Sequence, residues 1–193
     1  MAEAARNAQR RMALVEPPRL RQGVSIKVLP PETRFSLRLP MSIAAAMDEA
    51  AGFRLGMPIN RAEIAGARWS ARLGPNEWLL AGPESETDAI ASDVEKALAG
   101  KIYGLTDISH RNVALEAAGA DAAAALNAGC PLDLSDKAFP AGSATRTLLG
   151  KVEIILMRPR AEPSFRIECW RSFARYAHDF LVEAARDCPR IDR

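Results

Sequence analysis

The chain has 193 residues, of which 48% are hydrophobic and 26% are charged, as in an ordinary globular protein that can bury a core without disulfides or metals. The net charge is only +2, and no apolar run approaches the ~18 residues that a bilayer-spanning helix needs. Neither a nucleic-acid-binding protein nor a membrane protein is therefore indicated.

The first 21 residues differ from the rest of the chain in charge. Residues 1–21 contain five arginines and only two glutamates, whereas the remainder is close to neutral. The opening sequence MAEAARNAQRRMALVEPP lacks the apolar stretch and the small-residue cleavage site of a secretory signal. We therefore predict a cytoplasmic protein with a basic, disordered arm at 1–21 and a folded domain at 22–193. Because the arm has too little apolar content to fold alone, we expect it to order only against a partner.

The first predicted elements are two strands. Apolar and polar residues alternate over residues 23–29 and 34–39, and the turn sequence PPET separates the two runs. Ser42 is predicted to cap a short helix of small residues that Gly52 stops. A loop is then marked by Gly56, Pro58 and Asn60.

Three further strands and a helix complete the first half. The strands are predicted at residues 62–68, 69–74 and 77–82, and the turn sequence GPN joins the last two in a hairpin. Ser85 and Asp88 resemble a capping box at the start of a helix that ends at Gly100. The apolar face of this helix is formed by Ile90, Val94, Ala97 and Leu98.

The second half begins with the strand NVALEAAG at residues 112–119. Asp121 then occupies the N-cap position of a short helix, and Gly129 is expected to supply its left-handed C-terminal residue. After the loops CPLDLS and FPAGS, a long strand or hairpin with a bulge at Gly150 is predicted over residues 146–159.

The chain ends in a predicted strand at residues 164–170 and a helix at residues 171–186. The apolar positions of the helix recur at three- and four-residue steps: Phe173, Ala177, Phe180, Leu181 and Ala184. Neighbouring strands joined by tight turns and interrupted by single helices indicate an α+β fold class with mostly antiparallel sheet. A strand–helix–strand arrangement occurs twice, which suggests two sub-lobes at about 22–104 and 105–188.

The stretch TDISHR (106–111) contains the residue types of a hydrolase site, but its spacing argues against one. Adjacent residues on a strand point to opposite faces, so Ser109 and His110 would not form a nucleophile and base. The sequence also has no GxSxG elbow. Asp107 and Ser109 are instead expected to fix a turn through hydrogen bonds to backbone N–H groups.

Metal and thiol chemistry are not indicated either. The cysteines Cys130, Cys169 and Cys188 have no CxxC spacing, and His110 and His178 do not share a helix face. Cys130 follows a helix C-terminus and Cys169 faces inward on a strand, so both are expected to be framework residues. We therefore predict no catalytic residue and no metal ligand on this chain.

The sequence also contains no motif typical of a phosphate-binding loop. It has neither GxGxxG nor GxxxxGK[ST], and the helix after Gly119 starts with an aspartate that would repel phosphate. One mixed set of residues could line a flat aromatic pocket or a protein interface: Trp69, Trp78, Trp170, Arg111, Arg146 and Arg171. Trp78 could equally anchor the core. Arg171 places a cation at a helix start, where the helix dipole disfavours it, so it could instead bind a partner or a neighbouring carboxylate.

Four segments together resemble a known family: RLGPNEWLLAGP (72–83), TDISHRNVALEAAGADAAAALNAGCPLDL (106–134), FPAGSATRTLLGKVEIILMRP (139–159) and FRIECWRSFARYAHDFLVEAA (165–185). Their order and spacing resemble the gamma subunit of heterotetrameric sarcosine oxidase and, more distantly, the folate-binding fold of the aminomethyltransferases (glycine-cleavage T-proteins). The ending RIECWRSFARY points to the gamma subunit in particular. The resemblance covers roughly residues 22–186.

This resemblance implies a non-catalytic structural subunit whose partners are alpha, beta and delta subunits. The complex would oxidise sarcosine with oxygen to glycine and hydrogen peroxide, and tetrahydrofolate would accept the one-carbon unit as 5,10-methylene-tetrahydrofolate. The cofactors FAD, FMN, NAD and tetrahydrofolate are implied to lie on the other subunits, and none on this chain. Arg111 is then expected to begin a strand or to reach a partner.

The alternative is a stand-alone folate-binding aminomethyltransferase-like or assembly protein. The chain has about half the length of a full aminomethyltransferase, which argues against a complete folate cavity on this chain alone. The cysteine motif of the related iron–sulfur assembly proteins, KGC with a later GQE, is missing, since Cys130 stands in NAGCPLD. Both differences, in length and in the cysteine motif, favour the gamma subunit over a stand-alone protein.

Overall fold

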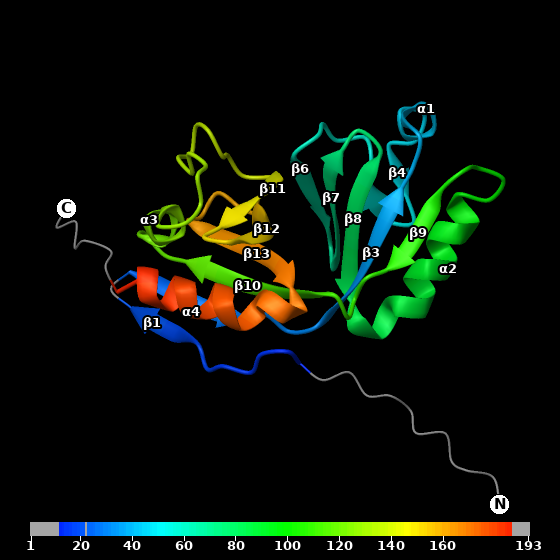
Figure 1. Ribbon diagram of the computed structural model, residues 1–193. Helices are drawn as coiled ribbons and strands as arrows, with labels where there is room; N and C mark the ends of the chain where they lie inside the picture. The colour runs from blue at the N-terminus through cyan, green and yellow to red at the C-terminus, as the bar shows by residue number, and fades with distance from the viewer. Residues whose placement is uncertain (1–11, 22, 187–193) are drawn as a thin grey trace, which may run out of the picture.

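The computed structural model describes residues 12–21 and 23–186. In this part of the chain, eleven antiparallel strands form one sheet in the order β1–β2–β10–β13–β12–β11–β6–β7–β8–β3–β9. The fold class is therefore α+β with mostly antiparallel sheet, as predicted (Figure 1).

The strands of the first half are β1 (Arg19–Arg21), β2 (Val24–Val28), β3 (Glu32–Arg38), β4 (Glu49–Ala50), β5 (Phe53–Arg54), β6 (Arg61–Ala65), β7 (Arg68–Gly74), β8 (Glu77–Pro83) and β9 (Gly104–Asp107). Those of the second half are β10 (Asn112–Ala118), β11 (Ser143–Leu149), β12 (Val152–Arg158) and β13 (Ser164–Trp170). The helices are α1 (Met41–Ala44), η1 (Glu84–Glu86), α2 (Thr87–Ala97), α3 (Ala122–Asn127), η2 (Arg171–Phe173) and α4 (Ala174–Ala184).

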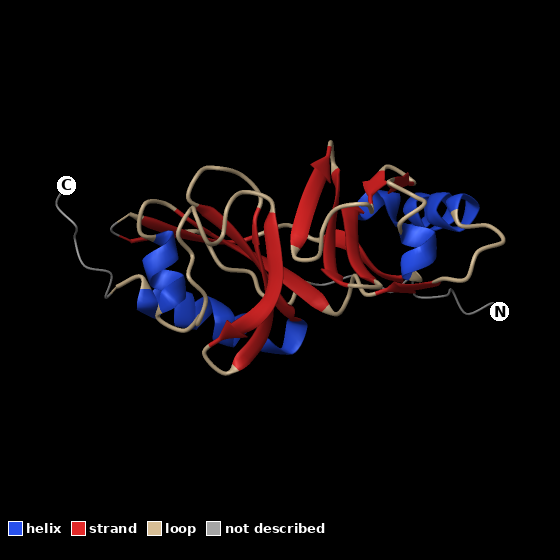
Figure 2. Cartoon of the chain, turned by 90° about the horizontal axis from the view of Figure 1, so that it is seen from above, coloured by secondary structure: helices blue, strands red, loops and turns tan. Residues whose placement is uncertain are grey.

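The sheet bends into two parts that meet where β11 pairs with β6 at a single position, Ser143 opposite Arg61. Seen from above, the helices lie on the two outer sides of the molecule and the strands lie between them (Figure 2). Helix α2 covers the part formed by β3, β7, β8 and β9, and helices α3 and α4 cover the part formed by β2, β10, β12 and β13. The layers are thus helix, sheet, sheet, helix.

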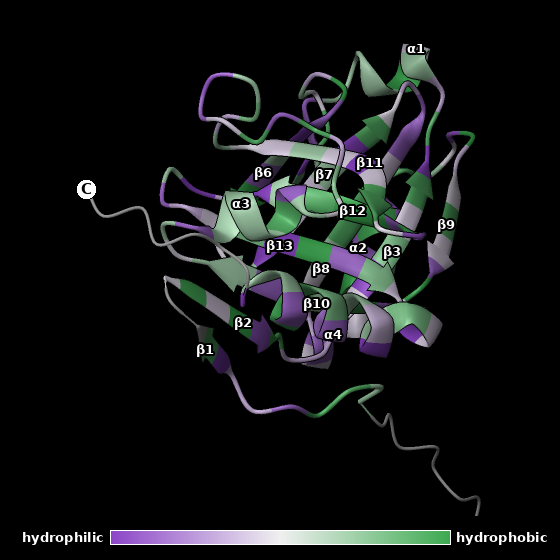
Figure 3. Ribbon diagram, turned by 60° about the vertical axis from the view of Figure 1, so that its left-hand side comes forward, coloured by the Kyte–Doolittle hydropathy of each residue, from purple (hydrophilic) through white to green (hydrophobic). Residues whose placement is uncertain are grey.

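Strands β8 and β12 are buried on both faces because they lie in the middle of these layers. Trp78 and Leu80 of β8 pack toward α2, whereas Leu79 packs toward the other half of the sheet. Likewise Ile154 and Leu156 of β12 pack toward α3 and α4, whereas Ile155 and Met157 pack toward β6, β7 and β8. This two-sided burial explains the nearly continuous apolar runs WLLA and VEIILM. Elements at the outside of the molecule, such as β2 and α4, instead alternate between hydrophilic and hydrophobic residues (Figure 3).

Residues 12–21 of the predicted arm have a defined structure in this chain alone. Leu14 is buried among residues of α3, α4 and the strands beneath them. Glu16 forms an ion pair with Arg175 of α4 at 2.6 Å, and β1 pairs with β2. The prediction of a disordered arm is thus wrong for this stretch, because one apolar side chain and a free strand edge suffice to hold it. Residues 1–11 lie outside the described residues.

Two predicted helix features are corrected. The helix expected from Ser42 to Gly52 is a single turn, α1, with Pro40 at its N-cap, and it is followed by the small hairpin of β4 and β5. The extended chain of this hairpin carries Phe53 and Leu55 into the core beneath α2. The capping box of Ser85 and Asp88 is not formed, since η1 precedes α2 and Thr87 bonds back to the carbonyl of Glu84.

Two glycines have roles other than those predicted. Gly150 lies in the tight turn between β11 and β12 with φ +59°, so this segment is a hairpin without a bulge at that glycine. Asp121 does stand at the N-cap of α3, without a side-chain capping bond. Gly129 is not in the left-handed region. Its position requires a residue without a side chain, because Phe180 and the backbone of Gly150 lie against it.

We expect Gly129→Ala to lower the free energy of unfolding by about 1–3 kcal/mol, the usual cost of overpacking. The new Cβ would lie 2.5 Å from Cζ of Phe180 and 2.8 Å from the backbone nitrogen of Gly150. Urea unfolding of the full-length chain measures the change. Gly104→Ala is the matched control, because its nearest heavy atom would be 3.7 Å away. Equal stability of the two variants would refute the packing explanation.

Candidate functional site

A buried pair of opposite charges connects the two parts of the sheet. Arg34 of β3 donates from Nε to Oε2 of Glu168 of β13 at 2.8 Å and from Nη2 to Oε1 at 3.0 Å. The side chains are 1% and 0% exposed, although 134 positions separate them in the sequence. Since two parallel hydrogen bonds hold the pair, it fixes the geometry as well as the charge at this junction.

A second arginine completes the network. Arg166 of β13 donates from Nη2 to Oε1 of Glu168 at 2.6 Å and also binds the carboxylate of Glu32. Its guanidinium lies 4.9 Å from the centroid of the Trp69 ring, close enough for a cation–π contact. Burial works to raise the pKa of Glu168, but the charges of Arg34 and Arg166 and their hydrogen bonds outweigh it and lower the pKa to about 2. Glu168 is therefore a structural carboxylate that is ionised at neutral pH.

A cavity of about 490 Å³ lies beside this network. Its walls combine apolar side chains with charged groups of both signs: Trp69, Met157, Ile64, Arg160, Arg166, Glu116 and Glu162. The guanidinium of Arg166 is already held by Glu32 and Glu168. The cavity can therefore admit an apolar or aromatic group, but its buried cation is engaged in holding the fold together.

The TDISHR stretch is a turn, as predicted. The backbone N–H of Ser109 donates to Oδ1 of Asp107 at 2.8 Å, and the hydroxyl of Ser109 donates to the same oxygen at 2.5 Å. The hydroxyl also accepts the backbone N–H of Arg34 at 2.9 Å. Ser109 is buried whereas His110 is exposed, so the two side chains do not form a nucleophile–base pair.

We expect Ser109→Ala to lower the free energy of unfolding by about 1–3 kcal/mol, because the buried N–H of Arg34 would lose its acceptor. Chemical denaturation followed by circular dichroism measures the loss. The control is Ser172→Ala, at an exposed hydroxyl, which should change stability by less than about 0.5 kcal/mol. An unaffected Ser109→Ala variant would show that the turn does not depend on this hydroxyl.

The two described cysteines are framework residues, as predicted. Cys130 is 3% exposed and Cys169 is 1% exposed. Burial, assisted by the neighbouring charge of Glu168, raises the pKa of the Cys169 thiol to about 12, so it stays protonated and unreactive. Cys188 lies outside the described residues. Within residues 12–21 and 23–186, no group of His, Cys, Asp and Glu side chains is arranged to hold a metal ion.

The structure places Trp78 and Trp69 apart from the other members of the mixed set, whereas Arg111, Arg146 and Trp170 line a common hollow. Trp78 is fully buried and donates from Nε1 to the carbonyl of Leu55 at 3.0 Å, so it is a core anchor. Trp69 lies under Arg166, as described above. Trp170 is 48% exposed and lies beside Arg111 and Arg171. The remaining member, Arg146, forms an ion pair with Glu77 of β8.

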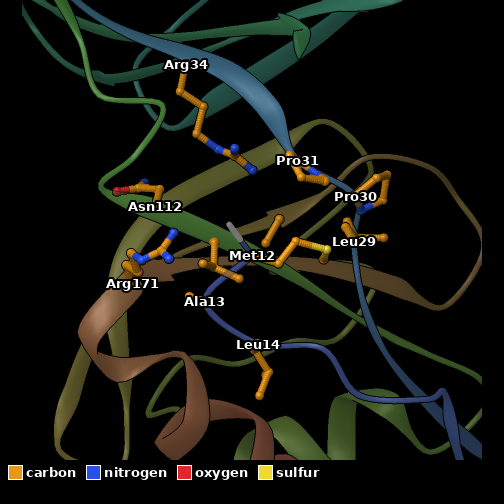
Figure 4. Close-up of a pocket in the computed structure, with 11 residues that line it drawn as sticks. Met12, Ala13, Leu14, Leu29, Pro30, Pro31, Arg34, Asn112 and Arg171 are labelled. Carbon is orange, nitrogen blue, oxygen red and sulfur yellow. The ribbon is translucent and has the colours of Figure 1, made fainter. Parts of the chain in front are cut away.

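Arg171 begins η2 and faces a small internal space of about 20 Å³, enough for one water molecule. Figure 4 shows its guanidinium pointing toward Asn112, with Arg34 entering from the other side and Met12 and Ala13 closing the space. The backbone N–H of Arg171 donates to the carbonyl of Arg111 at 2.7 Å. The backbones of Arg111, just before β10, and Arg171, at the start of η2, therefore lie next to each other.

The chain has the fold of an aminomethyltransferase. The chain superposes on the glycine cleavage system aminomethyltransferase T from Bartonella henselae with a TM-score of 0.64 and 18% identity, over 88% of this chain and 51% of that chain. At this identity the likeness shows the fold alone. None of the helices in the described part of the chain combines the length and apolar character that crossing a membrane requires.

Residues 39–187 match the family "Sarcosine oxidase, gamma subunit". The sarcosine oxidase subunit gamma of an Arthrobacter species is 30% identical over 138 residues, which cover 70% of this chain and 66% of that relative's length. A chain of the heterotetrameric sarcosine oxidase from Corynebacterium sp. U-96, solved with pyrrole 2-carboxylate, superposes with a TM-score of 0.71 and 27% identity, over 90% of this chain and 87% of that one. The chain belongs to the sarcosine oxidase gamma subunit family.

Sequence reasoning missed the buried network of Arg34, Glu168, Arg166 and Glu32. Arg166 and Glu168 alternate with apolar residues on β13 and therefore looked like the exposed face of a half-buried strand. The only signal in the sequence was a strand on which charged and apolar residues alternate, and the structure alone shows that this strand pairs on both sides, with β10 and with β12. Sequence alone offered no means of pairing residue 34 with residue 168.

Proposed function

We propose that this chain is a non-catalytic structural subunit of a heterotetrameric sarcosine oxidase. The complex would oxidise sarcosine with oxygen to glycine and hydrogen peroxide, and tetrahydrofolate would accept the one-carbon unit as 5,10-methylene-tetrahydrofolate. The observation that carries this proposal is the match of residues 39–187 to the gamma subunit family.

The geometry supports a structural role. The carboxylate of Glu168 is held between two guanidiniums, the hydroxyl of Ser109 is used in a turn, and the thiol of Cys169 is buried and protonated. These three groups, which could otherwise perform acid–base or nucleophilic chemistry, are therefore engaged in maintaining the fold. We propose that this chain contributes no catalytic, cofactor-binding or metal-binding residue.

The partners follow from the same proposal. They are the alpha, beta and delta subunits, which would carry FAD, FMN, NAD and tetrahydrofolate, in a cytoplasmic complex. The folded domain of residues 22–193 would act as one unit made of two sub-lobes near 22–104 and 105–188. Strand β2 would belong to the second sub-lobe, since it pairs with β10.

The test is to purify the tagged full-length chain from its native cells and to read the absorbance of the eluate for flavin. A yellow complex with three further polypeptides and sarcosine-dependent peroxide formation is expected. A colourless, solitary protein would overturn the proposal. Calorimetry with tetrahydrofolate would then test the alternative, a stand-alone folate-binding protein, and heat of binding at millimolar ligand would support it.

A further inference from the structure

The corner around Trp170 combines exposed aromatic rings with two arginines, Arg111 and Arg171, that form no ion pair with another described residue. Four consecutive residues, 170–173, are exposed, although Phe173 was predicted to face the core. Trp170 and Phe173 are 48% and 38% exposed, and their rings stack with centroids 6.1 Å apart. Two large aromatic side chains held together in solvent form a preorganised apolar surface, which is the composition of an interface anchor.

The charges at this corner are unbalanced. Among the described residues, Arg171 has no carboxylate within ion-pair distance, and Arg111 hydrogen-bonds only the neutral amide of Asn112, while the carboxylate of Glu77 attracts it at longer range. By contrast, nearby Arg146 pairs with Glu77 and Arg175 pairs with Glu16. A backbone hydrogen bond joins Arg171 to Arg111, and both residues line the same hollow, so an anion bound there would meet two cations.

A shallow hollow of about 570 Å³ lies over these groups. Its lining residues are Met12, Ala13, Arg111, Trp170, Arg171 and Ser172, of which two are cationic and none is acidic. The charge of the hollow is therefore complementary to an acidic surface.

Resting on the proposed function, we propose that this Trp170 corner (Met12, Arg111 and residues 170–173) docks an acidic segment of a partner subunit. A carboxylate of that segment binds Arg111 and Arg171, and an apolar side chain packs on Trp170. A stable interface buries about 800 Å² on each partner, so the corner is the anchor of a larger contact.

The test compares variants of this chain in binding to the flavin-containing partner subunits. Arg111→Glu with Arg171→Glu, and separately Trp170→Ala, are each expected to weaken assembly at least about tenfold, as interface anchors do. Wild-type assembly should weaken as salt rises from low to high ionic strength, and the double charge reversal should remove most of that salt dependence. Arg160→Glu is the matched control, because Arg160 is also exposed but lies at the separate cavity beside Trp69.

The outcomes separate this inference from the proposed function. If the wild-type chain does not assemble with flavin-containing subunits, the proposed function itself fails. If the wild type assembles and the corner variants assemble equally well, only the docking inference is overturned. Thermal unfolding of each variant confirms that it is folded, and Arg171→Gln replaces the charge reversal if that variant does not fold. A photo-crosslinking residue at Ser172 should capture a peptide rich in Asp and Glu, and capture of a basic peptide would contradict the acidic occupant.

Discussion

Replacing Glu168 with alanine is expected to lower the free energy of unfolding by about 3–5 kcal/mol, the usual cost of breaking a buried ion pair. The change would leave Arg34 and Arg166 with uncompensated charge at the junction of the two parts of the sheet, where Arg34 is 1% exposed. Urea unfolding of the full-length chain measures the loss.

Two comparisons decide whether the charge is responsible. Glu183→Ala breaks the exposed pair with Arg186 and should cost less than about 1 kcal/mol. Glu168→Gln keeps the shape of the side chain and removes its charge, so it should also be strongly destabilised. A Glu168→Gln variant as stable as the wild type would mean that the hydrogen-bonding shape, and not the charge, holds the junction together.

The same network predicts a dependence of stability on pH. The pKa of Glu168 is about 2 in the folded chain, below its ordinary value of 4.5. Because the folded pKa is the lower one, the contribution of Glu168 to stability is fully present above pH 4.5 and is lost as the pH falls from 4.5 toward 2. The stability difference between the wild type and Glu168→Ala should be constant from pH 7 to about 5.5 and shrink below 4.5. A difference that does not change across this window would contradict the lowered pKa.

Trp78→Ala should have a comparable effect, about 3–5 kcal/mol, as expected for removing a fully buried aromatic side chain. Trp78 is 0% exposed in the core beneath α2, and its loss would also leave the carbonyl of Leu55 without its donor. The guanidinium of Arg72 lies 5.0 Å from its ring centroid and would lose that contact as well. Circular dichroism in urea is the appropriate measurement, because the substitution removes a fluorophore.

Trp170→Ala is the matched control for Trp78→Ala. Trp170 is 48% exposed, so its removal should cost less than about 1 kcal/mol of stability. The two tryptophans should thus have opposite profiles, with Trp78 needed for folding and Trp170 for assembly. Equal losses of stability in the two variants would contradict this division of roles.

Local sequence patterns were sufficient to predict those elements whose conformation depends mainly on residues close to them in the sequence. The strands predicted at 77–82 and 164–170 correspond to β8 and β13, because alternation and apolar runs bounded by turns are local signals. The turn of Asp107 and Ser109 was also predictable, since its defining bond spans only two positions. Local reasoning failed for the helix after Ser42, where Phe53 and Leu55 enter the core from an extended chain.

The α+β class, most of the strands, the framework character of the TDISHR turn and the resemblance to the gamma subunit family could all be inferred from the order of the residues. Three features required the packed chain: the burial of β8 and β12 on both faces, the pairing of Arg34 with Glu168, and the exposure of Trp170 and Arg171 beside Arg111. The physical reason is that a repeating pattern shows which side of an element is apolar, whereas the partner of a side chain depends on how distant elements pack. For Arg34 and Glu168, 134 positions apart, that partner is set by the meeting of the two parts of the sheet.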